Sequence, residues 1–173
     1  MGAAQIRAIS AALISMNGWV PCEFTRRSLR SLLLLKRFKA TEYRLILLYV
    51  GLIIFSNLPR PLYQHFLVFH VIATIFVDPS LCASHLNYAG ELSVYFVKSF
   101  IDLYGREFVS HCVHSMIYVK ADVEKFGAVD NFSAFRFENF YRTLTRLVRK
   151  GDKPLQQSAK RYLELEKKLF QAS

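Results

Sequence analysis

Two apolar runs separated by a pair of prolines constrain the fold of this chain more than any other feature. The runs are "LILLYVGLIIF" (Leu45–Phe55) and "FLVFHVIATIFV" (Phe66–Val77), and "SNLPRPLYQH" lies between them. A membrane-spanning helix needs about 20 apolar residues, and each run has about half that length. Proline also prevents one helix from joining the two runs. We therefore predict two buried core helices with a turn between them, and a membrane-embedded helical hairpin at residues 45–77 is the alternative.

The rest of the chain has apolar residues at helical spacing and no alternating runs joined by a hairpin turn. The clearest helix follows Asp78, a capping residue, with Pro79 at the first helical position and Gly105 at the end. Ser133 is expected to cap a later helix that ends at Gly151. We predict an all-α array of about five to seven helices with short connections.

Length and composition indicate one folded domain. The 173 residues are 53% hydrophobic, which is enough to build a core. We expect residues 1–20 to form a poorly defined N-terminal segment and residues 21–173 to form a single helical domain. Three widely spaced cysteines do not make a disulfide framework and favour a reducing compartment, the nucleus or the cytoplasm, with a membrane location as the alternative.

The net charge of +10 indicates an anionic partner, either nucleic acid or a membrane surface. Two basic groups carry much of this charge. The first contains Arg26, Arg27, Arg30, Lys36, Arg37 and Lys39, and the second contains Arg142, Arg146, Arg149, Lys150, Lys153, Lys160 and Arg161. Helical spacing places Arg142, Arg146, Arg149 and Lys153 on one stripe, which can follow a DNA backbone. With Lys150 these are the predicted DNA-binding residues, and an ordinary solvated face is the alternative.

Two pairs of metal-ligating residues have helical i, i+3 spacing. They are His111 with His114 and Cys82 with His85, and together they would supply the four ligands of a structural zinc site. Neither pair has the more diagnostic C-x2-C spacing, and a free cysteine often serves as a small core residue. We keep the four residues as candidate ligands, and we expect neither a bound metal nor any other cofactor.

A single carboxylate, Glu138, lies in the aromatic stretch "FSAFRFENFYR" ahead of the second basic group. Two-metal phosphoryl transfer requires two or three converging carboxylates, and no other acid lies one helical turn away. Arg142 does lie one turn away, so an i, i+4 ion pair between Glu138 and Arg142 is the simpler interpretation.

Several longer stretches resemble the C-terminal part of transposase-derived proteins that are distantly similar to CACTA-type (En/Spm) DNA transposases. The most specific stretch is "VEKFGAVDNFSAFRFENFYRTLTRLVRKGDKPLQQ", and "LPRPLYQHFLVFHVIATIFVDPSLC" and "YAGELSVYFVKSFIDLYGREFVSHCVHSM" add to it. The resemblance covers residues 19–161. It implies the helical insertion and C-terminal end of an RNase H-like enzyme, in which two Asp and one Glu hold two Mg²⁺ ions.

By this resemblance Glu138 matches the third acid of the family. His114 matches the first of two family histidines that precede the Glu, whereas Tyr118 occupies the position of the second. No β-rich segment precedes the helices to supply the two Asp residues. We therefore expect a non-catalytic, truncated transposase-derived domain in which Glu138 is inactive and DNA binding is weak and nonspecific. Two alternatives to this function remain. One is a relic protein-interaction module whose apolar faces are covered by a protein partner, and the other is the small membrane protein with the helical hairpin at residues 45–77.

Overall fold

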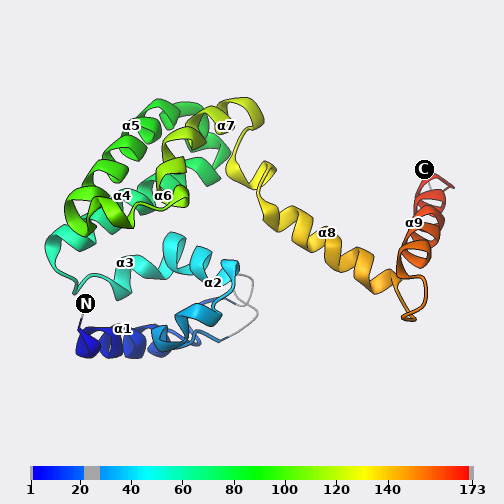
Figure 1. Ribbon diagram of the computed structural model, residues 1–173, viewed down its shortest axis with the longest axis horizontal. Helices are drawn as coiled ribbons and strands as arrows, with labels where there is room; N and C mark the ends of the chain where they lie inside the picture. The colour runs from blue at the N-terminus through cyan, green and yellow to red at the C-terminus, as the bar shows by residue number, and fades with distance from the viewer. Residues whose placement is uncertain (1, 22–27, 172–173) are drawn as a thin grey trace. The chain divides into compact units, whose positions relative to one another are not determined.

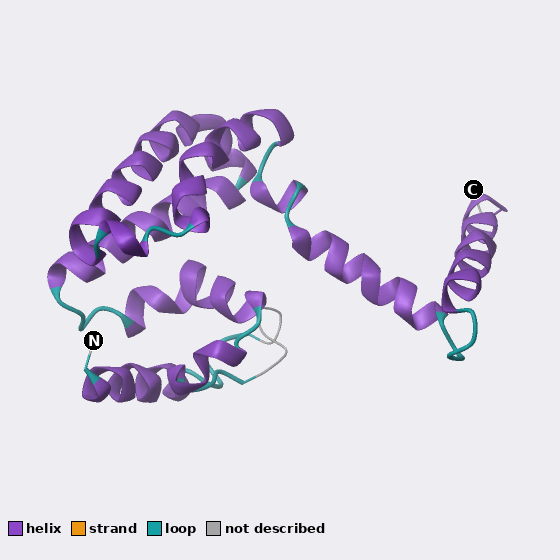
Figure 2. Cartoon of the chain, in the orientation of Figure 1, coloured by secondary structure: helices purple, strands orange, loops and turns teal. Residues whose placement is uncertain are grey.

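The computed structural model describes residues 2–21 and 28–171, and the regular elements in these residues are helices joined by short loops (Figure 1). Helical residues make up 80% of the described part of the chain, which contains no strand (Figure 2), and this confirms the all-α class. The α-helices are α1 (Ala3–Ser15), α2 (Ala40–Leu45), α3 (Gly51–Ile54), α4 (Arg60–Val77), α5 (Pro79–Tyr104), α6 (His111–Ser115), α7 (Val119–Phe126), α8 (Ala134–Leu147) and α9 (Pro154–Gln171). Short 3-10 segments are η1 (Leu32–Arg37), η3 (Arg106–Phe108), η4 (Met116–Tyr118) and η5 (Val129–Asn131), and η2 (Ile46–Val50) is a π-helix.

The chain divides into two compact units, Met1–Gly127 (unit 1) and Ala128–Ser173 (unit 2). This division differs from the expected boundary after residue 20. The N-terminal segment forms helix α1 and contributes the buried side chains of Ile9 and Leu13 to the core of unit 1. Their burial explains why the segment is ordered, since each apolar side chain removed from water stabilises the folded state by about 1.5–3 kcal/mol.

Two polar side chains of the N-terminal region hold the segment that follows it. Asn17 donates to the Leu29 carbonyl at 3.0 Å and accepts from the Leu29 amide at 2.6 Å. The Ser10 hydroxyl accepts from the Leu32 amide at 3.1 Å. These bonds satisfy backbone groups where no regular element does so, and they position Leu29 within the core.

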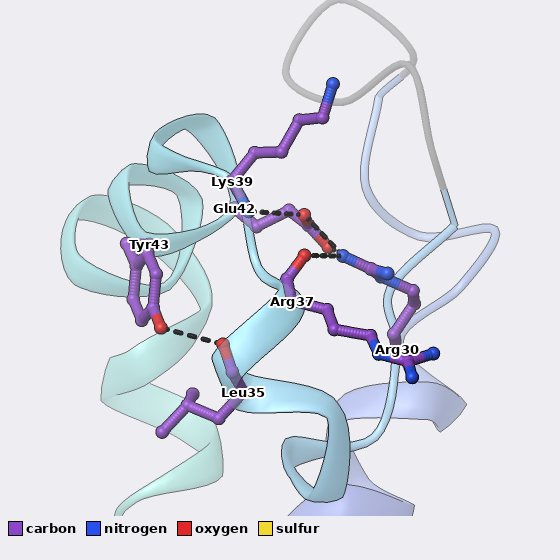
Figure 3. A network of polar contacts seen from close by, with 6 residues as sticks. All are labelled: Arg30, Leu35, Arg37, Lys39, Glu42 and Tyr43. Atoms are coloured by element: carbon purple, nitrogen blue, oxygen red, sulfur yellow. Dashed lines mark hydrogen bonds and ion pairs between the residues drawn. The ribbon is translucent and has the colours of Figure 1, made fainter.

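A buried carboxylate, Glu42, organises the start of α2 (Figure 3). It is 8% exposed, and it accepts from the Lys39 amide at 2.8 Å and from Arg30 at 2.9 and 2.7 Å. Arg30 also donates to the Arg37 carbonyl at 2.9 Å. The hydrogen bond to Glu42 raises the pKa of Arg30. Arg30 therefore neutralises a buried acid of its own chain and does not belong with the cations that can bind an external anion.

The two apolar runs form two helical segments joined by a turn, as predicted. The first lies in the continuous run α2–η2–α3, and the second lies in α4. Residues 55–59, between them, are outside the α-helices. No helix among the described residues has the length and apolar character needed to cross a membrane.

Helices α4 and α5 form an antiparallel hairpin (Figure 1). Asp78 is both the C-cap of the first helix and the N-cap of the second, so it connects the two. Its carboxylate accepts from the Ser80 and Leu81 amides at 2.7 and 3.0 Å, and Pro79 occupies the first turn, which confirms the predicted cap. Gly105 ends α5 with a φ of +99°, a conformation that favours glycine. Between the two helices Ile72, Ala89 and Ser93 are fully buried.

Gly51 permits a close contact between the first apolar run and α4. A Cβ atom at this position would collide with the Ile46 carbonyl oxygen and with the Phe66 ring. The Gly51 amide donates to the same Ile46 carbonyl, which is the five-residue step of a π-turn. The glycine weakens the helix by about 1 kcal/mol relative to alanine, and the packing that it allows offsets that cost.

We expect Gly51→Ala to destabilise the protein by about 1–3 kcal/mol, because the new methyl group overpacks the contact with Phe66. Gly90→Ala, in the interior of α5, is the matched control. Its Cβ would meet the Lys120 side chain at 2.6 Å, and a flexible lysine can move aside. That variant should be as stable as the native chain or up to about 1 kcal/mol more stable. Urea denaturation followed by circular dichroism measures both, and equal effects of the two substitutions would contradict the packing role.

Candidate nucleic-acid interface

Unit 2 contains all the predicted DNA-binding residues, but it does not place them on one helix. Helix α8 ends at Leu147, and Val148 is extended with φ −85° and ψ 115°. Residues 148–153, here called the basic loop, connect α8 to α9. The predicted helix end at Gly151 and the predicted four-residue stripe are therefore wrong. Arg142 and Arg146 lie on α8, and Arg149, Lys150 and Lys153 lie on the basic loop.

The side chain of Gln157 holds the basic loop against the first turns of α9. Its carbonyl oxygen accepts from the Arg149 and Lys150 amides at 3.2 and 3.4 Å. Its amide nitrogen donates to the Lys150 carbonyl at 3.1 Å and to the Asp152 carbonyl. One amide side chain thus satisfies backbone groups on both sides of the loop. The basic side chains of the loop take no part in these bonds.

Helices α8 and α9 pack against each other beside the loop. The rings of Phe140 and Tyr162 meet edge to face with centroids 6.0 Å apart. Arg161 donates to the Leu147 carbonyl at 2.6 Å, where α8 has lost its own hydrogen-bond donors. Arg161 is therefore partly occupied in capping α8.

A groove of about 620 Å³ lies between the end of α8 and α9. Its lining includes three cations, Arg149, Lys160 and Arg161, and one acid, Glu164. Arg149, Lys160 and Glu164 are exposed, and Gln157 forms part of the wall. A groove with three cations and one acid in its lining can accept a phosphate group, which prefers cations and polar hydrogen-bond donors.

The five predicted DNA-binding residues have exposed side chains that none of the described acids neutralises. Within 4.0 Å, no ion pair in the described residues involves Arg142, Arg146, Arg149, Lys150 or Lys153. By contrast, Lys120 pairs with Glu124 at 3.2 Å and Arg30 pairs with Glu42 at 2.7 Å. Arg30 of the first basic group is thus not equivalent to the cations of the second, whereas Lys36, Arg37 and Lys39 are exposed and make no ion pair with a described residue. Arg26 and Arg27 of that first group lie outside the described residues.

Glu138 is exposed on α8, and the expected ion pair with Arg142 is wrong. Among the side chains that the structure describes, Glu138 has no cation within 4.0 Å. Ser133 occupies the predicted N-cap position of α8, but its hydroxyl makes no capping bond and has no partner among the described residues. Glu138 lies beyond the first turn of α8, which contains no acid, so the helix dipole gives it little stabilisation.

The four candidate zinc ligands do not converge. His111, His114 and His85 are exposed, and the Cys82 thiol donates to the Ile75 carbonyl at 3.0 Å. Burial raises the pKa of Cys82, and the nearby Asp78 carboxylate adds to that rise, so the thiolate that zinc binds is disfavoured. In the described part of the chain no three Cys, His, Asp or Glu side chains form a cluster that could hold a metal ion.

Sequence reasoning missed Gln157. Its neighbour Gln156 is an identical residue in the same helical turn, and no spacing rule separates the two. Only the path of the loop, which returns past Gln157, distinguishes them.

Comparison with known proteins adds no relative: no protein-family model, curated protein or solved structure matches this chain. The resemblance to CACTA-type transposases, including the RNase H-like fold, therefore stays a prediction.

We expect Gln157→Ala to release the basic loop while the two helices remain folded. Hydrogen exchange at the Arg149 and Lys150 amides should become faster, by up to about tenfold for each hydrogen bond removed. Gln156→Ala is the control, since Gln156 is exposed on the same turn. Hydrogen exchange measured by NMR distinguishes the two variants. An unchanged exchange rate at the Arg149 amide in Gln157→Ala would contradict the role of Gln157 in ordering the loop.

Proposed function

We propose that this chain is a non-catalytic, transposase-derived helical domain that binds duplex DNA weakly and without sequence preference. One observation carries the proposal: five exposed cations on α8 and the basic loop have no ion-pair partner among the described side chains. A cation that its own chain does not neutralise can exchange its counterions for DNA phosphates, and the release of those counterions drives binding.

The charge balance of unit 2 supports the same proposal. Residues 128–173 contain ten Lys and Arg against five Asp and Glu, so about half of the net charge of +10 lies in about a quarter of the chain. The bonds made by Gln157 fix the backbone from which Arg149 and Lys150 project. A loop that is already ordered loses less conformational entropy when DNA binds.

The residue types at this surface favour binding without sequence preference. The predicted contacts are Arg and Lys side chains, which serve the DNA backbone in a sequence-tolerant way. We therefore assign the interface to phosphates, with a steep dependence on salt.

The non-catalytic part of the proposal is supported by the surroundings of Glu138. Two-metal phosphoryl transfer requires carboxylates that converge on the cations. In the described part of the chain no three metal-ligating side chains form such a group, and Glu138 has no second acid beside it in a cluster of this kind.

Exposed apolar side chains in unit 2 favour a second candidate, a protein-interaction module. Phe137, Tyr141 and Leu155 are 70%, 68% and 84% exposed. Large apolar residues in such numbers on a small helical unit are typical of a surface that is covered in an assembly. Weak DNA binding and a protein contact are compatible, since they use different side chains.

The DNA proposal predicts a specific loss of affinity when the basic loop is neutralised. We expect the triple variant Arg149→Gln, Lys150→Gln, Lys153→Gln to bind a short fluorescein-labelled duplex more weakly than the native chain at about 50 mM salt. The slope of log affinity against log salt should decrease by about 0.9 for each phosphate that the variant no longer neutralises. Fluorescence anisotropy at several salt concentrations measures both quantities.

The triple variant Lys36→Gln, Arg37→Gln, Lys39→Gln is the matched control, because it removes the same charge from exposed positions of unit 1. It should keep most of the affinity and of the slope. An equal loss in both variants would show that overall charge, and not the basic loop, causes binding. Absence of binding by the native chain at low salt would reject the proposal.

We further expect no Mg²⁺-dependent cleavage or joining of DNA by the native chain or by Glu138→Gln. Removing the unpaired acid should instead tighten DNA binding slightly, because one repulsive charge is removed. Glu166→Gln, an exposed acid on α9, is the control for this charge effect. A gel assay with supercoiled plasmid tests the chemistry. Nuclease activity that disappears in Glu138→Gln and persists in Glu166→Gln would contradict the proposal.

A further inference from the structure

Unit 1 contains a hollow of about 400 Å³, here called the aromatic pocket, where α4, α5 and α6 meet. Its lining includes His65 and Phe69 on α4, Phe96, Phe100 and Tyr104 on α5, and Met116 on η4. Its volume is within the range of about 300–1,000 Å³ that is typical of sites for small molecules. It lies wholly in unit 1 and shares no residue with the basic loop.

Aromatic rings surround His65 within the pocket. The imidazole stacks on Phe96 with centroids 4.4 Å apart and an interplanar angle of 14°. Tyr104 meets the same imidazole edge to face at 5.5 Å, and Phe69 stacks on Phe96 at 5.0 Å. An additional planar ring can make offset or edge-to-face contacts with aromatic side chains of this kind.

His65 supplies a hydrogen-bond acceptor to this apolar setting. Its Nε2 lies 3.2 Å from the Phe96 carbonyl oxygen. A carbonyl can only accept, so Nε2 carries the proton, and in the neutral imidazole Nδ1 is then an acceptor. Burial lowers the pKa of His65, although the bond to the Phe96 carbonyl opposes that change, which favours the neutral ring. Nδ1 makes no hydrogen bond to any of the described residues.

Among the described residues, no Lys, Arg, Asp or Glu lines the aromatic pocket. A phosphate or a carboxylate placed here would lose its hydration without gaining a partner, at a cost of several kcal/mol. The pocket therefore excludes the anions that suit the basic loop and selects an uncharged ligand.

We propose that the aromatic pocket binds a small, neutral, planar aromatic molecule with one hydrogen-bond donor, of the indole or phenol class. The ring of the ligand packs against Phe100, Tyr104 and Met116, and its donor binds the acceptor nitrogen of His65. This site is independent of DNA binding.

The test uses the full chain and two matched probes, indole and 1-methylindole, which differ by the N–H donor. NMR titration of the native chain should show saturable shifts at Phe96, Phe100 and Met116 with indole. It should also show affinity about tenfold weaker for 1-methylindole, which is the size of one hydrogen bond. His65→Phe keeps the ring and removes the acceptor, so it should bind both probes equally.

His70→Phe is the control, since His70 lies on the same helix but contacts the Leu47 carbonyl instead of the pocket. It should still prefer indole. Met116→Trp fills the pocket and should abolish binding of both probes, which provides a second variant if His65→Phe does not fold. Shifts outside the pocket, no saturation, or equal affinity of the native chain for both probes would overturn the proposal. Changes in the chemical shifts of the pocket residues when the protein is diluted without a probe would also overturn the proposal. Such changes would indicate that a second copy of the chain covers the site.

Discussion

The packing of α4 along α5 is the contact on which most of unit 1 depends. Ile72 from α4 and Ala89 and Ser93 from α5 are fully buried. The Ser93 hydroxyl donates a hydrogen bond to the Ala89 carbonyl at 2.8 Å, so this buried polar group is satisfied. The short Asp78 connection fixes the register of the two helices. Phe96 is part of the same buried surface and of the aromatic pocket. The pocket is therefore an extension of the core at one end of the hairpin.

Features that depend on neighbours in the chain could be predicted from the sequence. The Asp78 cap is made by amides two and three residues away, and Gly105 and Gly127 end their helices because each adopts a positive φ. The same locality explains why the all-α class and the two core helices were predictable. Hydrophobic spacing and helix caps are visible within a few residues of each element.

Features that depend on distant partners could not be predicted in this way. The spacing of Arg142, Arg146, Arg149 and Lys153 is compatible with a continuous helix. The break after Leu147 is favoured by long-range bonds, those of Gln157 to the loop and that of Arg161 to the Leu147 carbonyl. The aromatic pocket requires His65 and Phe96, which are 31 residues apart. Glu42 accepts hydrogen bonds from Arg30, which lies 12 residues earlier in the chain. In each case the missing information is the tertiary contact, which no periodicity contains.

Arg30 and Arg149 show why net charge alone does not locate a binding surface. Both are arginines in a chain with a net charge of +10, yet Arg30 donates to Glu42 and to the Arg37 carbonyl. The backbone of Arg149 is held by Gln157, so its guanidinium is not needed to order the loop. When an amide side chain orders the loop, the cations beside it keep their charge available to phosphates. The DNA proposal therefore rests on the separate roles of Gln157, which orders the loop, and of the cations beside it, and not on the number of positive residues.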